Sequence, residues 1–219
     1  MADADRTISA SSCLGGPVPG SVWVIAALCI LPELVLTGAD LRLWGQPWWR
    51  MVAYQYAGFW PGLLADWRPN YTLQPWTMFA SYGFLHAGIW HLSVNIATLF
   101  LLAGPVAARL GKGAVLPTYA ISLVGGAIGF AGLTSAPTPM VGASGALFGL
   151  AASILALEFD RRIARSLPVR NVLVMVFGLA AGNAILAWTS GGALAWQAHL
   201  GGFMAGWFHT TAVKLCRCA

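Results

Sequence analysis

The chain has 219 residues, of which 58% are hydrophobic and only 9% are charged. A typical soluble domain has about 25% charged residues, so this composition excludes an ordinary water-soluble domain and predicts a surface solvated mainly by lipid. The net charge of +5 does not indicate nucleic-acid binding, because the basic residues are scattered between apolar segments, where they report membrane topology. We therefore expect one compact all-α domain embedded in a lipid bilayer.

Six apolar segments approach the length of about 20 residues that a helix needs to cross a bilayer. Residues 1–20 are polar and rich in Gly and Pro and predict a disordered tail, and residues 214–219 are expected to form a second tail. Residues 21–213 between them are predicted to form a bundle of six membrane helices. The predicted spans, numbered one to six, cover about residues 22–38, 84–103, 114–133, 140–158, 171–189 and 194–213.

Lysines and arginines are distributed unevenly over the two sides of this predicted bundle. With the spans placed alternately, nine basic residues fall on the side of the two termini and three on the other. The positive-inside rule then places both termini in the cytoplasm. The nine residues are Arg6, Arg109, Lys112, Arg161, Arg162, Arg165, Arg170, Lys214 and Arg217, and the other three are Arg42, Arg50 and Arg68.

A long segment, residues 39–80, separates the first two spans and is predicted to lie on the outer side. An apolar ring with one N–H is most stable at the level of the lipid headgroups. The segment is therefore expected to be a structured loop at the outer interface, although its aromatic residues could also simply anchor the neighbouring spans. It holds six of the eleven tryptophans: Trp44, Trp48, Trp49, Trp60, Trp67 and Trp76.

Residue supply argues against metal-dependent and aspartyl chemistry inside the membrane. The cysteines at positions 13, 29, 216 and 218 have the spacing of neither a zinc site nor a disulfide framework. His86 and His91 lack the glutamate of a His-Glu-x-x-His motif, and on one helix they would point about 140° apart. No predicted span contains an aspartate. We expect no metal and no other cofactor.

Polar residues inside membrane spans are costly and therefore informative. Ser144 begins span four among small residues, and His199 lies near the start of span six. With 1.5 Å per residue, Ser144 is predicted about 6 Å and His199 about 8 Å below the outer end of its span. On span two, His91 and Asn95 share one helix face at depths of about 10 and 16 Å. All four are expected in the outer half of the membrane.

This set of residues predicts nucleophilic chemistry. A serine needs a base to accept its proton, and histidine titrates in the useful range. The backbone N–H groups of Ala143 and Ser144, at a helix N-terminus, are candidate donors for an oxyanion. No acidic residue is placed to orient His199, so a Ser–His dyad is expected and not a triad. Phe148, one turn after Ser144, is expected to pack against the imidazole.

Structural explanations remain open for each of these residues taken alone. A single membrane histidine or asparagine is often an interhelical polar bridge, and Gly142 and Gly145 are typical of close helix packing. Two further functions also stay open. One is a small transporter with a polar path through the same residues, although the inner halves of the spans are mostly apolar. The other is a catalytically inactive protein that binds membrane clients.

The spaced motifs resemble those of the rhomboid intramembrane serine proteases. The resemblance covers roughly residues 75–210, with matching residues in spans two, four and six and in the turn at 108–111. They are His86-Ala-Gly-Ile-Trp-His91-Leu-Ser-Val-Asn95, Ala108-Arg109-Leu110-Gly111, Gly142-Ala143-Ser144-Gly145, and Ala198-His199-Leu-Gly-Gly202-xxx-Gly206.

The resemblance implies a nucleophilic Ser144, a basic His199 and an oxyanion hole lined by His91 and Asn95. Gly142, Gly145, Phe148 and His86 are expected to support them. The implied substrates are membrane proteins whose single transmembrane helix is cut near its outer end at small residues. The six-span form resembles the common bacterial type, which implies a bacterial inner membrane, and the oligomeric state stays open.

Two positions depart from the family pattern. Trp76 is followed by Thr77, where the family often has arginine, and this leaves the stabilising contacts of the loop at 39–80 open. Phe148 stands where the family often has tyrosine, which removes only a hydroxyl group. Neither departure touches Ser144 or His199, so an active enzyme is expected.

Overall fold

A computed structural model describes residues 18–134, 137–191 and 194–218. These residues are mainly helical and contain no strand, and Phe59 and Met140 form one isolated antiparallel bridge. The long helices are α1 (Gly20–Asp40), α4 (Ile89–Leu110), α5 (Val115–Leu133), α6 (Ser144–Ala164), α7 (Arg170–Thr189) and α8 (Trp196–Cys218). The short ones are α2 (Trp49–Ala57) and α3 (Gln74–Ser81), with 3₁₀ turns at Pro61–Leu64, Tyr82–Phe84 and Lys112–Ala114.

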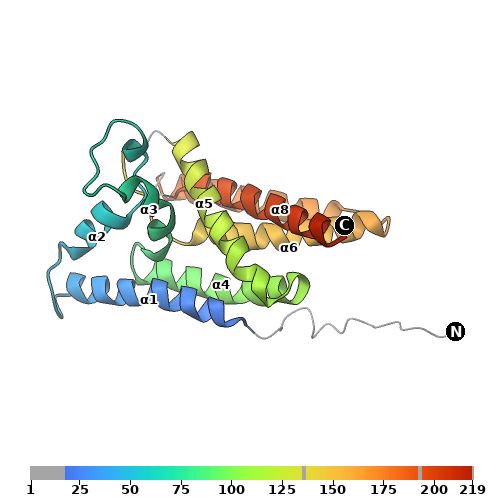
Figure 1. The fold of residues 1–219 in the computed structure, drawn as a ribbon, viewed down its shortest axis with the longest axis horizontal. Coiled ribbons are helices and arrows are strands. Elements are labelled where there is room, and N and C mark those ends of the chain that lie inside the picture. Colours follow the sequence, from blue (N-terminus) through green and yellow to red (C-terminus); the bar gives the residue numbers. More distant parts are fainter. Residues whose placement is uncertain (1–17, 135–136, 192–193, 219) are drawn as a thin grey trace.

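The long helices form a bundle with α2 and α3 at one end. In Figure 1, α1 and α4 lie side by side, α6 and α8 lie side by side, and α5 crosses between the two pairs. The first residues of α4, α6 and α8 all lie at the end occupied by α2 and α3, whereas the C-terminus of the chain lies at the opposite end. The candidate residues near these helix starts are thereby brought to one end of the bundle.

Glycines allow α5, α6 and α8 to pack backbone against backbone. A Cβ atom added at Gly202 or Gly206 of α8 would overlap the carbonyl oxygen of Gly145 or Gly149 on α6, and one added at Gly201 would overlap the Gly125 carbonyl oxygen on α5. Small residues permit this close approach between membrane helices. We call the contact of α6 with α8 the glycine seam, formed by Gly145, Gly149, Gly202 and Gly206.

Four helical segments of the described chain are long and apolar enough to cross a membrane: Gly20–Asp40, Ile89–Leu110, Lys112–Leu133 and Arg170–Thr189. Helices α6 and α8 are long enough, with 21 and 23 residues, but they do not meet the accompanying limits on charge and hydropathy. The last two turns of α6 carry Glu158, Asp160, Arg161 and Arg162, and α8 carries polar and glycine residues along its length. The protein is thus an all-helical membrane protein by fold and composition.

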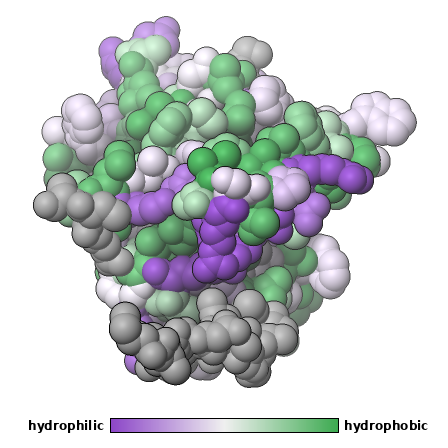
Figure 2. Space-filling view, turned by 90° about the vertical axis from the view of Figure 1, so that its right-hand side faces the viewer, coloured by the Kyte–Doolittle hydropathy of each residue, from purple (hydrophilic) through white to green (hydrophobic). Residues whose placement is uncertain are grey.

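Figure 2 views the end of the bundle away from α2 and α3 and shows hydrophilic side chains gathered among hydrophobic ones. The last turns of α4, α6 and α8 lie toward this end (Figure 1). Among their charged residues, Arg161 and Arg162 pair with Glu158, and Lys214 pairs with Asp160. Charged groups therefore gather at the end of the bundle opposite the candidate site.

Two predicted boundaries were wrong. The second span was predicted from residue 84 and the fourth from residue 140, but α4 begins at Ile89 and α6 at Ser144. Gly88 (φ 98°) and Gly142 (φ 123°) adopt left-handed backbone conformations that interrupt a helix just before each start. Helix α8 continues beyond its apolar part, so residues 214–218 of the predicted C-terminal tail are helical. The predicted disordered tail lies largely outside the described residues.

The segment predicted as a loop, residues 39–80, contains α2, α3 and one of the 3₁₀ turns. Its middle is fixed to the bundle at Phe59, which is fully buried and forms the backbone bridge to Met140. The Phe59 ring also contacts Phe79, Tyr82 and Phe130 edge-on. The segment is therefore a packed part of the fold.

Candidate active site

Ser144 and His199 meet at the ends of α6 and α8. The distance from Ser144 Oγ to His199 Nε2 is 2.7 Å. Ser144 is the first residue of α6, and His199 lies in the first turn of α8. Gly145 allows this proximity, since a Cβ atom there would lie 3.1 Å from the Ala198 carbonyl oxygen. The glycine seam brings the two side chains within hydrogen-bonding distance.

The imidazole of His199 is held on its face and on its second nitrogen. Phe148 stacks on the ring with centroids 4.2 Å apart and planes 7° apart, as its position one turn after Ser144 led us to expect. His199 Nδ1 lies 2.7 Å from Oδ1 of Asn183 on α7. His199 is only 5% exposed. The buried ring is thus confined between three helices.

The contact with Asn183 determines which nitrogen of His199 carries the proton. The Asn183 amide nitrogen donates to the Trp196 carbonyl oxygen at 3.5 Å, and this turns Oδ1 toward the imidazole. A carbonyl oxygen can only accept, so Nδ1 carries the hydrogen and donates it. Nε2 is then free to accept the hydrogen bond of the Ser144 hydroxyl, which is the arrangement a general base requires.

Sequence reasoning missed Asn183. The partner of His199 is not an acidic residue but an amide in the middle of predicted span five. The signal was nevertheless present, because an asparagine inside an apolar span is costly and marks a specific contact. Its position relative to His199 depends on how α7 sits beside α8, and sequence spacing does not contain that information.

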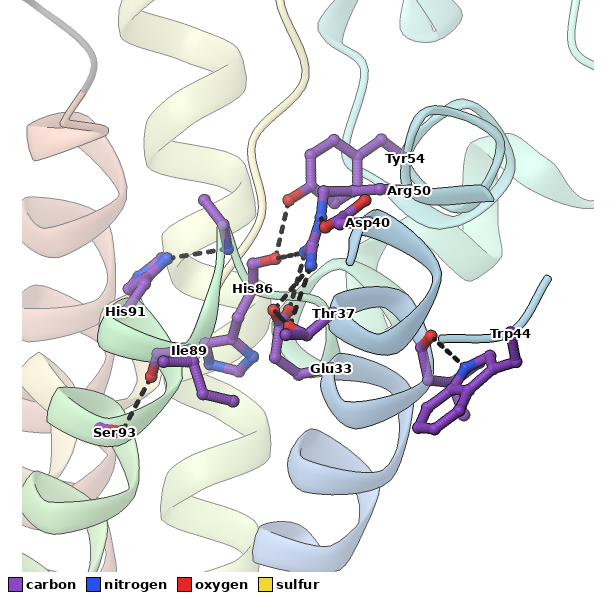
Figure 3. Close-up of polar contacts among 12 residues, drawn as sticks. Glu33, Thr37, Asp40, Trp44, Arg50, Tyr54, His86, Ile89, His91 and Ser93 are labelled. Carbon is purple, nitrogen blue, oxygen red and sulfur yellow. Dashed lines mark hydrogen bonds and ion pairs between the residues drawn. The ribbon is translucent and has the colours of Figure 1, made fainter. Parts of the chain in front are cut away.

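The two ring nitrogens of His91 have the reverse roles of those of His199, so that the N–H group faces the site. The Ala87 backbone N–H donates to His91 Nδ1 at 3.3 Å (Figure 3), so the ring hydrogen resides on Nε2. A Cβ atom at Gly142 would lie 2.7 Å from His91 Cε1 and 2.9 Å from Nε2. The N–H edge of His91 therefore packs against the backbone two residues before Ser144. It can donate to an anion formed there.

The first turn of α6 supplies further donors, because the first N–H groups of a helix have no intrahelical acceptor. The approach to this turn is held by the bridge at Met140 and by the Gly142 N–H, which donates to the Tyr82 carbonyl oxygen at 3.0 Å. A small cavity of about 70 Å³ opens between these elements. It is lined by His91, Met140, Val141, Gly142, Ser144, Gly145, Leu194, Ala195, Ala198 and His199.

Asn95 does not line this cavity. Its amide nitrogen donates to the carbonyl oxygen of His91 in its own helix at 2.7 Å, and its side chain is 4% exposed. The expected position on the same face as His91 was correct, but the amide is turned into the helix. Any contribution of Asn95 to an oxyanion hole in this conformation acts through the position of His91.

His86 lies in the extended turn at 85–88 before α4 and not on the helix. The expectation that His86 and His91 face different directions was therefore wrong: their rings lie edge to face with centroids 5.2 Å apart. His86 is fully buried, and neither ring nitrogen has a hydrogen-bond partner within the described part of the chain. No group of three metal-binding side chains is found among the described residues.

The backbone of His86 is fixed by a polar cluster around Arg50 (Figure 3). Arg50 of α2 donates two hydrogen bonds, of 2.9 and 2.8 Å, to the fully buried carboxylate of Glu33 on α1. It donates a third to the His86 carbonyl oxygen at 2.8 Å, and the Tyr54 hydroxyl donates to the same oxygen at 2.7 Å. We call Glu33, Arg50 and Tyr54 the arginine clasp.

Electrostatics in the arginine clasp favours the charged pair. The hydrogen bond with Glu33 raises the pKa of Arg50 above its usual range, and burial raises the pKa of Tyr54. Arg50 also pairs with Asp40 at 2.6 Å. The clasp ties α1 and α2 to the turn that carries His86 and Ala87, and the Ala87 N–H in turn holds His91. Thr77, the position that departs from the family pattern, hydrogen-bonds Tyr71 at 2.6 Å instead.

A larger cavity of about 610 Å³ lies on the other side of His199. It separates α7 from α8 and is lined mainly by apolar side chains, among them Leu179, Leu200 and Phe203. Asn183, Trp196 and His199 bring polar groups to its wall. His199 therefore stands between two cavities, with Ser144 on one side and Asn183 on the other.

Fold and site together define the protein as an all-helical membrane protein with a serine and a histidine joined at the ends of two packed helices. Residues 72–215, about two thirds of the chain, match the family model described as the Rhomboid domain. The chain therefore belongs to the rhomboid family.

The chain is also similar to named relatives over more than half of its length. It is 30% identical over 133 residues, 60% of its length, to "Rhomboid protease GluP" of Bacillus subtilis (strain 168). It is 31% identical over 126 residues to "Uncharacterized protein Rv1337" of Mycobacterium tuberculosis. The matches span 25% of the first relative and 52% of the second, so this chain corresponds to only part of each.

Proposed function

We propose that this protein is an intramembrane serine endopeptidase that cleaves transmembrane helices of other membrane proteins through a Ser144–His199 dyad. The observation that carries the proposal is the 2.7 Å contact between Ser144 Oγ and His199 Nε2 at a helix N-terminus. Membership of the rhomboid family, and a relative named as a protease, support it. A catalytically inactive client-binding protein is not favoured, since both members of the pair are present and in contact.

In this proposal the Ser144 hydroxyl attacks the scissile carbonyl and His199 Nε2 accepts its proton. The oxyanion that forms is stabilised by the backbone N–H groups of Ala143 and Ser144 and by His91 Nε2–H. Asn95 supports this hole by its hydrogen bond to the His91 backbone. His199 then returns the proton to the leaving amine, and water admitted from the outer face hydrolyses the acyl-enzyme.

We further propose that α6 and α8 complete a bundle of six spans over residues 21–213, with residues 1–20 and 214–219 at its cytoplasmic ends. Five of the nine basic residues that the positive-inside rule places in the cytoplasm lie in or just after the last turns of α4, α6 and α8, toward the end of the bundle away from α2 and α3 (Figure 1). They are Arg109, Lys112, Arg161, Arg162 and Lys214. The candidate site then opens to the outer face of a bacterial inner membrane.

The segment at residues 39–80 is proposed to lie at the outer interface. Trp48, Trp67 and Trp76 are each at least 43% exposed there, which suits rings placed among headgroups. A substrate helix in lipid has every backbone group hydrogen-bonded internally. Small residues near its outer end would let it unwind and present an extended strand to Ser144.

The test is co-expression with a reporter that carries a cleavable transmembrane helix, comparing wild type with Ser144→Ala and His199→Ala. Only the wild type should cleave, because each substitution removes one partner of the proton transfer. Labelling by a serine-reactive fluorophosphonate should likewise disappear in Ser144→Ala. Equal cleavage by the three proteins would exclude this assignment.

A further inference from the structure

We infer that Asn183 on α7 is a positioning residue that orients His199 as the base. This inference rests on the proposed function, since it concerns the same serine and histidine. It converts the expected dyad into a chain of three side chains from three helices: Ser144 on α6, His199 on α8 and Asn183 on α7.

The first argument is geometric. Both contacts of the imidazole are 2.7 Å long and lie on its two nitrogens. A neutral imidazole has one donor and one acceptor nitrogen. Because Asn183 presents a carbonyl oxygen, only the tautomer with hydrogen on Nδ1 satisfies both contacts. The other tautomer would place the Nε2 hydrogen against the Ser144 hydroxyl and leave no acceptor for its proton.

The second argument concerns the proton that moves. When Ser144 transfers its proton to Nε2, the ring becomes an imidazolium with a donor on each nitrogen. The Nδ1–H keeps its hydrogen bond to Asn183 throughout, so the oxygen dipole stabilises the positive charge as it forms. A neutral amide does this without burying a second charge in the apolar cavity, where an unpaired carboxylate would be costly.

The third argument is the cost of placing an amide here. Helix α7 contributes six residues to the lining of the 610 Å³ cavity, and Asn183 is the only one of the six with a polar side chain. The apolar wall is continued by Leu200 and Phe203 of α8. The other five residues of α7 are Val176, Leu179, Ala180, Ala184 and Ala187. A polar group inside an apolar membrane environment marks a specific hydrogen bond, and its oxygen points to His199.

The experiment compares Asn183→Asp, Asn183→Leu and Asn183→Ala in the full-length protein, with purified enzyme and a transmembrane reporter in proteoliposomes. Asp keeps an acceptor oxygen, so kcat should stay within about threefold of wild type. Leu has the same branched shape but no acceptor, so kcat should fall about tenfold to a hundredfold with KM unchanged. Ala should lie between them, because water can enter and accept the Nδ1 hydrogen.

This order separates positioning from packing. A residue that only fills the apolar cavity would be replaced best by Leu and worst by Asp. The matched control is Asn171→Ala at the start of the same helix, where the side chain is exposed and about 18 Å along the axis from Asn183. Asn171→Ala should leave kcat unchanged.

A second readout does not depend on turnover. In ¹⁵N NMR spectra of histidine-labelled protein, the wild-type His199 signals should report hydrogen on Nδ1, and Asn183→Leu should give a mixture of tautomers. Unchanged tautomer and kcat in Asn183→Leu would overturn the inference. If Ser144→Ala itself still cleaves, the proposed function fails instead, so the two failures are distinguishable.

Discussion

Ser144 and Asn183, the two side chains that hydrogen-bond His199, are held in very different ways, the first by the glycine seam and the second by helix α7. Ser144 is carried by α6, whose backbone touches α8 directly at Gly145 and Gly149. Asn183 is carried by α7, in which Val172 is the only buried residue. In the most apolar 18-residue stretch of α7 only 6% of the residues are buried inside the protein, whereas the share is 33% to 44% in the other three candidate spans.

This difference assigns separate tasks to the two regions. The distance between Ser144 and His199 is set by backbone contacts that can change only if two helices separate. The orientation of the imidazole depends on a helix that has little contact with the rest of the protein and faces a large cavity. A movement of α7 would therefore leave the serine beside the histidine but release the hydrogen bond that selects the tautomer.

The largest expected effect comes from breaking the glycine seam with Gly202→Ala. The added Cβ would meet the carbonyl group and Cα of Gly145, which are backbone atoms that cannot rotate away. Such overpacking costs about 1–3 kcal/mol or more and separates α6 from α8, so cleavage should fall at least a hundredfold. Activity and thermal unfolding in detergent measure the two effects.

The matched control is Gly178→Ala on α7, where an added Cβ has no neighbour within 4 Å. Alanine favours a helix over glycine by about 1 kcal/mol, so stability should be equal or slightly higher and cleavage unchanged. A similar loss of cleavage and of thermal stability in both variants would mean that the glycine seam and α7 are packed equally tightly, which contradicts the difference described above.

The next largest effect concerns the arginine clasp, which holds the turn before α4 and so helps to fix His91 beside Ser144. Arg50→Ala leaves the Glu33 carboxylate buried without its partner, and breaking a buried pair in this way costs about 3–5 kcal/mol. The turn at 85–88 also loses a donor to the His86 carbonyl oxygen. We expect a lower unfolding temperature and weaker fluorophosphonate labelling, because His91 is less well placed.

Arg68→Ala in the same segment is the control, since that side chain is exposed. The double variant Arg50→Met with Glu33→Leu removes both charges and should recover much of the stability lost in Arg50→Ala. If Arg50→Ala and Arg68→Ala unfold at the same temperature, the clasp contributes nothing measurable to the fold.

Long apolar runs explain why much of this fold was predictable. The bounds of α1, α5 and α7 follow from hydropathy to within about two residues, since a helix in lipid must be apolar along its length. Hydropathy does not separate an extended apolar segment from a helical one. It therefore placed Met140 and His86 inside helices, whereas the backbone at Gly142 and Gly88 starts each helix later.

The site was predictable where it depends on motifs and depth and not where it depends on side-chain torsions. Ser144 and His199 share a level because α6 and α8 both begin at the same end of the bundle. The amide of Asn95 could face the cavity or its own helix, and helical periodicity is the same for both. Arg50 and Glu33 are 17 residues apart across a turn, a pairing that sequence spacing does not reveal.

The smallest expected effect concerns Phe148, which contacts His199 from α6, the helix that the glycine seam holds against α8. Its ring stacks on the imidazole at 4.2 Å, and such aromatic pairs contribute about 0.5–1.5 kcal/mol beyond their buried area. Phe148→Ala should therefore lower kcat about twofold to tenfold, with Ser144 still labelled by fluorophosphonate. Phe148→Tyr keeps the ring and should stay within about twofold of wild type.

Combining Phe148→Ala with Asn183→Leu sharpens the contrast between the two regions. Both residues hold the same ring, one on its face and the other at Nδ1, so their effects are expected to couple and not to add. If the ring is held mainly by α7, the loss of Phe148 should matter more once Asn183 is replaced. Strictly additive losses in kcat would mean that stacking and hydrogen bonding hold His199 independently, and that α7 controls the tautomer without confining the ring.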